Sequence, residues 1–178
     1  MCDEVLKFWF EEIAPAKWWS AQQGVDELIN KRFLELHQRA SQGELYTWRN
    51  KSKGRLAEII VLDQFSRNIY RNTPCAFAQD PMSLVLAQEA VAASVHYSLS
   101  PIECSFLLMP YMHSESRQIH IQAEALYRTF APQKGYTFEL RHKAIIDRFG
   151  RYPHRNKILG RVSTAEENVF LAQPGSSF

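Results

Sequence analysis

The sequence predicts an all-α fold in a single domain. Apolar residues recur at helical spacing, helix start and stop signals follow one another at short intervals, and no segment shows the alternation typical of a strand. About eight helices joined by short loops imply antiparallel neighbours, as in stacked helical hairpins. We expect residues 1–173 to form this domain and residues 174–178 to form a mobile C-terminal tail.

The composition is that of a globular protein. With 178 residues, of which 46% are hydrophobic and 22% charged, the chain can bury a core without a disulfide or a metal. The three cysteines form no CxxC pair, so we interpret them as free thiols and predict no cofactor. No basic leader with a cleavage site opens the sequence, and no apolar run reaches the roughly 18 residues that span a bilayer. The sequence therefore predicts a cytoplasmic protein without membrane contact.

Two helices are predicted before residue 50. Residues 3–13 combine an acidic first turn with apolar residues at helical spacing, and Pro15 ends this helix. Asp26 is a candidate N-cap for a second helix that runs to about Ser41, with Gly43 as its terminator.

The third predicted helix, from about Gly54 to Tyr70, is nearly all apolar in its first half. A polar face then begins, whose members recur at helical intervals: Asp63, Gln64, Arg67, Asn68 and Arg71. A helix apolar enough to be buried must pair such groups internally or present them to a cavity.

Four further helices follow in the middle of the chain. Asp80 before Pro81 is a capping residue followed by an N1 proline, and that helix extends to about Tyr97. Ser100 and Glu103 have capping-box spacing and begin a short helix that we expect to end at Pro110. A turn with His113 and Glu115 precedes the next helix, which carries residues 119–130, and residues 137–149 form the seventh.

The last part of the chain concentrates positive charge. Residues 141–161 hold five arginines and two lysines against one aspartate, a net +6, so the rest of the chain carries −4 of the overall +2. Gly150 and Pro153 interrupt helix, which places the cluster in a loop. A short final helix follows, since Ser163 with Glu166 and Thr164 with Glu167 both fit a capping box. This loop indicates a site for something anionic.

Four sequence pieces together resemble one family. They are LDQFSRN at 62–68, AFAQDP at 76–81, PYMHSE at 110–115 and RFGRYPHRNKILGR at 148–161. In their order and spacing they resemble DUF924, a family of uncharacterised bacterial proteins. The resemblance implies a tetratricopeptide-like all-helical fold but no mechanism. Ser66 replaces the family's usual proline and Tyr152 its common phenylalanine, and we expect neither to alter a hydrogen-bonding group at the site.

Our first functional hypothesis is a cleft that binds, or transforms, a small anionic metabolite. Arginine suits carboxylate or phosphate, and a histidine beside a carboxylate suits proton transfer. The candidate acid–base residues are Asp63, His113, Glu115 and His154. The candidate ligand-binding residues are Gln64, Arg67, Asn68, Arg71, Arg151, Arg155 and Asn156.

Three alternatives stay open. The chain could be a helical interaction module whose arginines meet an acidic segment of a peptide or protein partner. The arginines could instead serve only architecture, by satisfying helix ends and buried carboxylates. A metal site from His113, Glu115, His142 and His154 has no HExxH pair to support it. A pI of 8.4 and few flanking aromatics argue against nucleic-acid binding.

Overall fold

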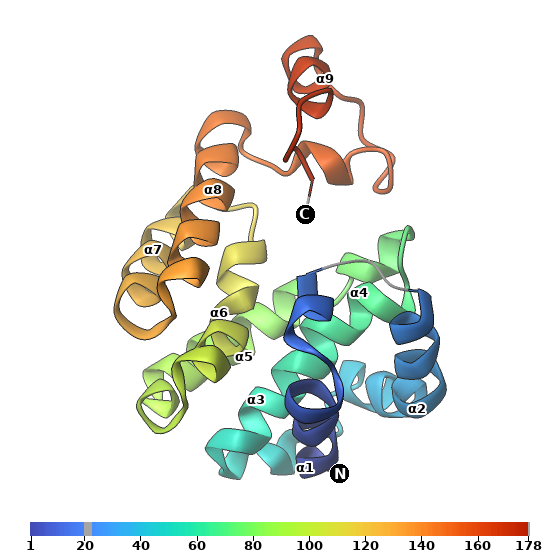
Figure 1. Cartoon of the computed structure of the whole chain (residues 1–178), viewed down its shortest axis with the longest axis vertical. Helices are drawn as coiled ribbons and strands as arrows, with labels where there is room; N and C mark the ends of the chain where they lie inside the picture. Colours follow the sequence, from blue (N-terminus) through green and yellow to red (C-terminus); the bar gives the residue numbers. More distant parts are fainter. Residues whose placement is uncertain (20–22, 178) are drawn as a thin grey trace.

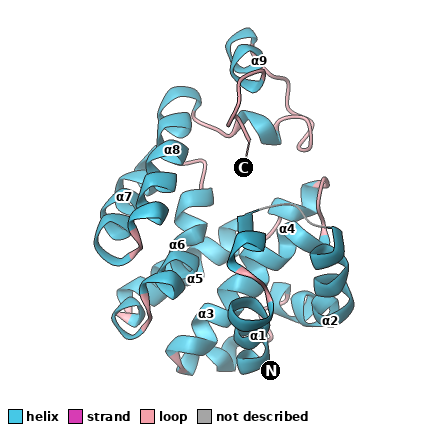
Figure 2. Ribbon diagram, viewed as in Figure 1, coloured by secondary structure: helices cyan, strands magenta, loops and turns pink. Residues whose placement is uncertain are grey.

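The computed structural model describes residues 1–19 and 23–177, and within them it contains helices and loops but no strand (Figure 2). The α-helices are α1 (Cys2–Lys7), α2 (Gln23–Ser41), α3 (Ser52–Ile60), α4 (Ser66–Ile69), α5 (Asp80–Ala92), α6 (Pro101–His113), α7 (Arg117–Phe130), α8 (Gln133–Phe149) and α9 (Ala165–Leu171). Short 3₁₀ turns are Pro15–Trp19, Tyr46–Asn50, Pro74–Phe77, Val95–Ser98 and Pro153–Arg155. The all-α prediction is confirmed.

One buried helix organises the fold. A π-helical turn, Val61–Phe65, joins α3 to α4, so residues 52–69 form one continuous central helix. It contacts α1 and α2 on one side and α5 and α6 on the other (Figure 1). Its apolar side chains, among them Leu56, Ile60 and Phe65, are fully buried. This burial explains why the first half of the helix reads as an unbroken apolar run.

The second half of the chain packs in sequence order. Helices α5 and α6, α6 and α7, and α7 and α8 are neighbours in space, connected by short turns as the hairpin prediction requires. The C-terminal segment, residues 150–177, lies beyond α8 at one end of the molecule (Figure 1). It shares a small separate hydrophobic cluster with the end of α8, formed by Ile145, Ile146, Tyr152, Phe149 and Phe170. The tetratricopeptide-like stacking stays a prediction.

Two predicted capping residues have other roles. Helix α2 begins before Asp26, whose carboxylate accepts hydrogen bonds from Arg71 and Asn68. Helix α5 begins at Asp80, but this side chain caps no backbone N–H and pairs with arginines instead. The capping boxes Ser100–Glu103 and Thr164–Glu167 are both present. From the sequence alone, an acidic residue that caps a helix cannot be distinguished from one that pairs with a distant arginine.

Three helix boundaries differ from prediction, whereas the first helix, which the π-helical turn Phe8–Glu12 completes, agrees with its predicted range. Helix α8 begins at Gln133 instead of residue 137. Helix α5 ends at Ala92, because Ser94 adopts a left-handed backbone conformation with φ of 60°. Pro110 lies inside α6, which continues to His113. Near a helix end proline removes only one hydrogen bond, and the buried residues around Pro110 hold the helix in place.

In residues 1–19 and 23–177 no helix is long and apolar enough to cross a membrane. The tail prediction falls partly on Phe178, which lies outside the described residues. Before it, the hydroxyl of Ser176 donates to the carbonyl of Leu171 at 3.1 Å.

The approach of Gly54 to the preceding turn gives a testable prediction. A Cβ at Gly54 would overlap the carbonyl oxygen of Trp48 and lie 2.8 Å from its carbonyl carbon. Gly54→Ala should therefore lower the free energy of unfolding by roughly 1–3 kcal/mol, although alanine favours helix. Gly24→Ala in α2 is the control, because no described atom lies within 4 Å, and it should be neutral or stabilising. Urea unfolding measures both, and equal stability of Gly54→Ala and wild type would contradict the packing argument.

Candidate functional site

The site is built around a buried carboxylate. Asp63 lies in the π-helical turn of the central helix and is fully buried. Its Oδ1 accepts a hydrogen bond from Nδ1 of His113 at 2.8 Å and lies 3.3 Å from Nη1 of Arg67. Its Oδ2 accepts from the amide of Gln64 at 2.5 Å. Burial opposes the charge, but Arg67 and His113 outweigh it and hold the pKa of Asp63 well below its usual range.

His113, at the end of α6, is oriented by this carboxylate. An ionised carboxylate only accepts, so Nδ1 of His113 carries the ring proton and Nε2 of the neutral ring has a lone pair. Within the described residues, Nε2 has no hydrogen-bond partner. Burial and then the charge of Arg67 lower the pKa of His113, and Asp63 opposes them. The ring is therefore neutral at pH 7 and can accept a proton at Nε2.

Asp80 connects the central helix to the C-terminal segment. Nη2 of Arg67 lies 3.0 Å from Oδ1 of Asp80, and Nη1 of Arg155 donates to Oδ2 at 3.2 Å. Asp63, Arg67, Asp80 and Arg155 thus form a chain of alternating charges across the fold. Sequence reasoning took Asp80 for a helix cap, although its place in the AFAQDP piece was a signal of a further role.

Arg155 packs against two aromatic rings. Its Cζ lies 4.6 Å from the ring centroids of both Phe77 and Tyr152, so two cation–π contacts hold the guanidinium in addition to Asp80. Burial and then the repulsion of Arg67 lower the pKa of Arg155. Its Nε is buried and has no hydrogen-bond partner among the described residues. One donor of this guanidinium is therefore unused.

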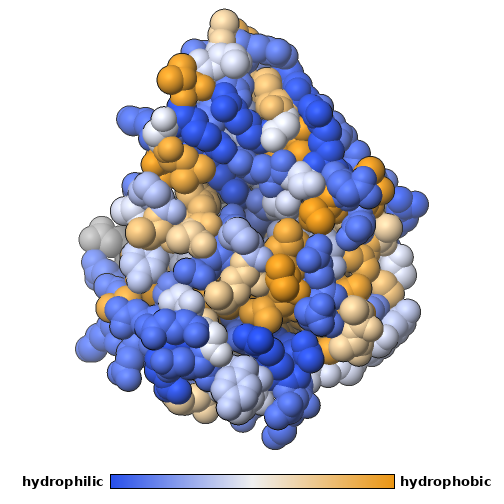
Figure 3. Space-filling view, turned by 180° about the vertical axis from the view of Figure 1, so that it is seen from behind, coloured by the Kyte–Doolittle hydropathy of each residue, from blue (hydrophilic) through white to orange (hydrophobic). Residues whose placement is uncertain are grey.

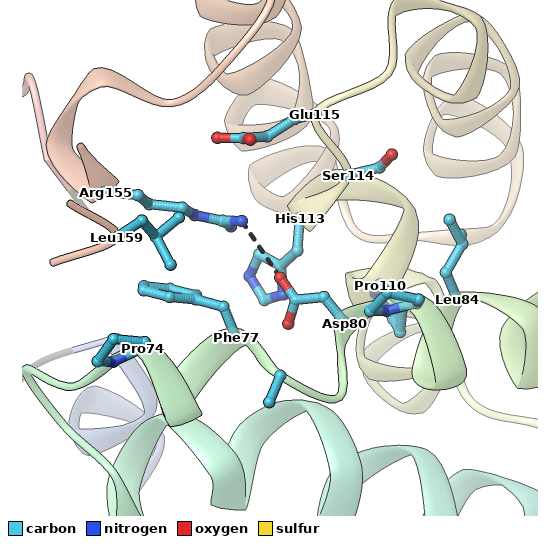
Figure 4. Close-up of a pocket in the computed structure, with 12 residues that line it drawn as sticks. Pro74, Phe77, Asp80, Leu84, Pro110, His113, Ser114, Glu115, Arg155 and Leu159 are labelled. Atoms are coloured by element: carbon cyan, nitrogen blue, oxygen red, sulfur yellow. Dashed lines mark hydrogen bonds and ion pairs between the residues drawn. The ribbon is translucent and has the colours of Figure 1, made fainter. Parts of the chain in front are cut away.

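A cleft of about 420 Å³ lies where these elements meet (Figure 4). Its polar lining consists of Asp80, His113, Ser114, Glu115 and Arg155. Its apolar lining consists of Pro74, Phe77, Ala78, Pro81, Leu84, Pro110 and Leu159. The residues come from the start of α5 and the turn before it, from the end of α6 with the α6–α7 connection, and from the C-terminal segment, so three distant parts of the chain form one cavity.

Glu115 lines the cleft but is firmly held. Nη1 and Nη2 of Arg161 donate to its two oxygens at 2.6 and 2.9 Å, and the backbone N–H of Tyr152 donates at 2.7 Å. Burial opposes its charge, but these bonds to Arg161 and Tyr152 lower the pKa of Glu115. Glu115 therefore fixes the arginine loop against α7 and is a poor proton acceptor at neutral pH.

The structure brings only some of the predicted site residues to the cleft. Asn68 and Arg71 point to α2, where both donate to Asp26. Arg151 forms a bidentate pair with Glu167, its Nε and Nη2 lying 2.6 and 2.8 Å from the two carboxylate oxygens. Since their hydrogen-bonding groups are occupied there, these three side chains hold helices together instead of lining the cleft.

Three other predicted residues do not line the cleft but contact residues that position it. The amide of Asn156 donates to Ser163 and accepts from Nε of Arg161 at 3.0 Å, which orders the arginine loop. Gln64 and Arg67 contact Asp63 directly. His154 is not among the residues that line the cleft. Burial and then Arg155 lower its pKa to about 4.

Tyr152 and Ser66, which we expect not to alter a hydrogen-bonding group at the site, both form buried hydrogen bonds outside the lining of the cleft. The hydroxyl of Tyr152 donates to the backbone carbonyl of Met112 at 2.5 Å. The hydroxyl of Ser66 donates to the carbonyl of Leu62 at 2.5 Å and lies 2.7 Å from Nε2 of His37. These contacts are buried, so they stabilise the packing around the site and leave its polar lining unchanged.

A metal centre is not assembled by the described side chains. In residues 1–19 and 23–177, no three His, Cys, Asp or Glu side chains gather in a group that could hold a metal ion. His142, one of the four residues considered, is buried and its Nδ1 donates to the carbonyl of Phe138 at 2.8 Å.

Fold and site together define an all-helical protein with a histidine–aspartate pair and a stacked arginine at one cleft. The chain belongs to the DUF924 family, described as bacterial protein of unknown function, whose model matches residues 5–175. It is similar to the solved structure of the protein of unknown function ATU0120 from Agrobacterium tumefaciens, with a TM-score of 0.91, 30% identity and 96% of each chain covered. No curated protein matches. The family resemblance read from the sequence is confirmed.

Buried neutral histidines make the fold sensitive to mild acid. Burial lowers the pKa of His142 to about 3 and that of His154 to about 4, from the ordinary value of 6.5. The unfolded chain binds these protons first, so the free energy of unfolding is highest above pH 6.5 and falls as the pH decreases from there.

Urea unfolding at a series of pH values tests this dependence. His142→Gln should make the decline below pH 6.5 shallower, by up to about 1.4 kcal/mol per pH unit, because one proton no longer binds the unfolded chain preferentially. Lys134→Gln on the same helix is the control. A free energy of unfolding that stays constant as the pH is lowered from 6.5 to the ordinary pKa of carboxyl groups would rule out this explanation.

Proposed function

We propose that the cleft binds a small organic anion, a carboxylate or a phosphate ester, and that His113 exchanges a proton with it. The observation that carries this proposal is the pairing of His113 with Asp63 in the cavity that Arg155 also lines. A lone pair on Nε2 and a fixed guanidinium that line the same cavity can act on one ligand. The anion gives Arg155 a second partner beside Asp80, and the histidine is the acid or base.

The size and walls of the cleft fit a small molecule with an apolar part. Its volume of about 420 Å³ falls within the range of roughly 300–1,000 Å³ typical of ligand pockets. Phe77, Leu84 and Leu159 form apolar walls, and the ends of the Asp80, His113 and Arg155 side chains lie close together between them (Figure 4). Such a lining suits a ligand whose carboxylate or phosphate meets these polar groups while its apolar part contacts the walls.

Arg155 is the arginine best suited to bind the anion. Arg71, Arg151 and Arg161 each form bidentate or paired contacts with a carboxylate outside or at the rim of the cleft. Arg155 uses Nη1 on Asp80 and has an unpartnered Nε. Stacking between Phe77 and Tyr152 orients it before the ligand arrives, which lowers the entropic cost of binding.

The interaction-module hypothesis has less support. It requires arginines that are available on an open face, whereas the loop arginines meet acids of the same chain. On the face shown in Figure 3, hydrophilic residues cover most of the view and hydrophobic residues form smaller groups among them. An acidic partner would have to displace several internal ion pairs.

We place this binding in the cytoplasm. Cys2, Cys75 and Cys104 are free thiols, which persist in a reducing compartment.

Substitution of Arg155 tests the proposed function. In calorimetry with phenylacetate and phenyl phosphate, Arg155→Ala should weaken binding by at least about 1.5 kcal/mol, because a charged donor is lost. Arg155→Lys keeps the charge without the planar fork and should recover only part of the affinity. Arg148→Ala is the matched control, since Arg148 belongs to the same cluster but pairs with the exposed Glu166.

The outcomes separate the two hypotheses. A metabolite cleft predicts that Arg148→Ala binds like wild type and that added salt has a small effect. If neither probe binds wild type, while an acidic peptide does and is released by salt, the interaction module is the better explanation.

A further inference from the structure

We propose that the cleft takes up one proton with each anion it binds, and that Nε2 of His113 receives it. This inference rests on the proposed function and adds a property of the same site: the ligand and a proton enter together. Three features support this proton uptake: the charge balance of the cleft, the tautomer of His113 and the poor proton affinity of the other groups that face it.

The charges of the side chains around the cleft balance. Three carboxylates, Asp63, Asp80 and Glu115, face three guanidinium groups, and they pair as follows: Arg67 with Asp63 and Asp80, Arg155 with Asp80, and Arg161 with Glu115. With His113 neutral, their sum is zero. An anion that enters alone would leave one uncompensated negative charge in a partly buried cavity, which is costly. One added proton restores the balance.

The tautomer of His113 identifies the atom that accepts this proton. Because Asp63 fixes the ring proton on Nδ1, the neutral ring presents a lone pair at Nε2. A lone pair repels an anionic oxygen. Once Nε2 is protonated, the ring donates from Nδ1 to Asp63 and from Nε2 toward the ligand, so both neighbours stabilise the imidazolium. Asp63 therefore favours protonation of the His113 ring when the anion binds.

The other charged or titratable groups that face His113 are not suited to take the proton. On the central helix Asp63 is strongly acidic and Arg67 is already charged, and on α5 Asp80 is paired with two arginines. On α8 and the C-terminal segment, burial lowers the pKa of His142 to about 3 and of His154 to about 4. His113 lines the cleft, whereas His142 and His154 do not, so the ligand changes the environment of His113 more directly than that of either other histidine.

Proton uptake has a measurable signature. Calorimetry of phenylacetate binding near neutral pH, in Tris and in triethanolamine, separates the heat of buffer ionisation from the heat of binding. Phenylacetate remains ionised in this range, so any proton taken up enters the protein. The wild type should take up about one proton per bound anion, and its affinity should fall about tenfold per pH unit between the pKa of His113 in the free protein and its higher pKa in the complex.

His113→Asn is the variant of choice. Asparagine keeps a side-chain N–H for Asp63 but has no second ring nitrogen, so uptake should fall to zero and the affinity should lose its pH dependence. His154→Asn is the matched control and should take up the same proton as wild type. In wild type, NMR of the His113 ring should show both nitrogens protonated after phenylacetate is added, which tests the assignment even if a variant fails to fold.

Three results would overturn this inference in different ways. Binding without proton uptake in wild type refutes it and leaves the proposed function intact. Uptake that persists in His113→Asn assigns the proton to another group. Absence of any binding by phenylacetate or phenyl phosphate removes the proposed function itself, and the proton uptake with it.

Discussion

The buried carboxylate of Asp63 is the constraint on which the rest of the site depends. Placing an ionised carboxylate in a fully buried turn is costly unless several donors surround it. The fold supplies an amide, a guanidinium and an imidazole, and the last two connect Asp63 to other elements. Arg67 brings Asp80 and, through it, Arg155, while His113 brings the end of α6. The cleft lies beside these contacts, and His113, Asp80 and Arg155 line it.

Much of the fold could be predicted because helix signals are local. Apolar spacing, the Ser100–Glu103 and Thr164–Glu167 capping boxes and the terminating glycines depend on neighbouring residues only. The need of Asp63 for a positive partner could also be predicted, since a polar group on an apolar helix must be paired. What failed were Asp26 and Asp80, whose partners are arginines 45 and 75 residues away in sequence.

The arginine loop shows why charge density alone does not locate a binding residue. Sequence reasoning treated Arg151 and Arg155 alike, as members of one basic loop. In the structure Arg151 meets Glu167, whereas Cζ of Arg155 lies 4.6 Å from the ring centroids of Phe77 and Tyr152. Arg151 and Arg161 pair with acids of the same chain, as the architectural interpretation expects, and Arg155 differs because its Nε has no hydrogen-bond partner among the described residues. Which acid faces which arginine is decided by tertiary packing.

The small hydrophobic cluster of the C-terminal segment has a consequence for how the cleft is maintained. Arg155 and Leu159 line the cleft from a part of the chain whose apolar side chains pack separately from the main core. A unit with little buried apolar surface opens at a lower free energy than the whole molecule. The cavity then exists only while this minor unit stays docked, so ligand affinity includes a docking equilibrium, and amide exchange of residues 150–160 reports the state of the cleft independently of global unfolding.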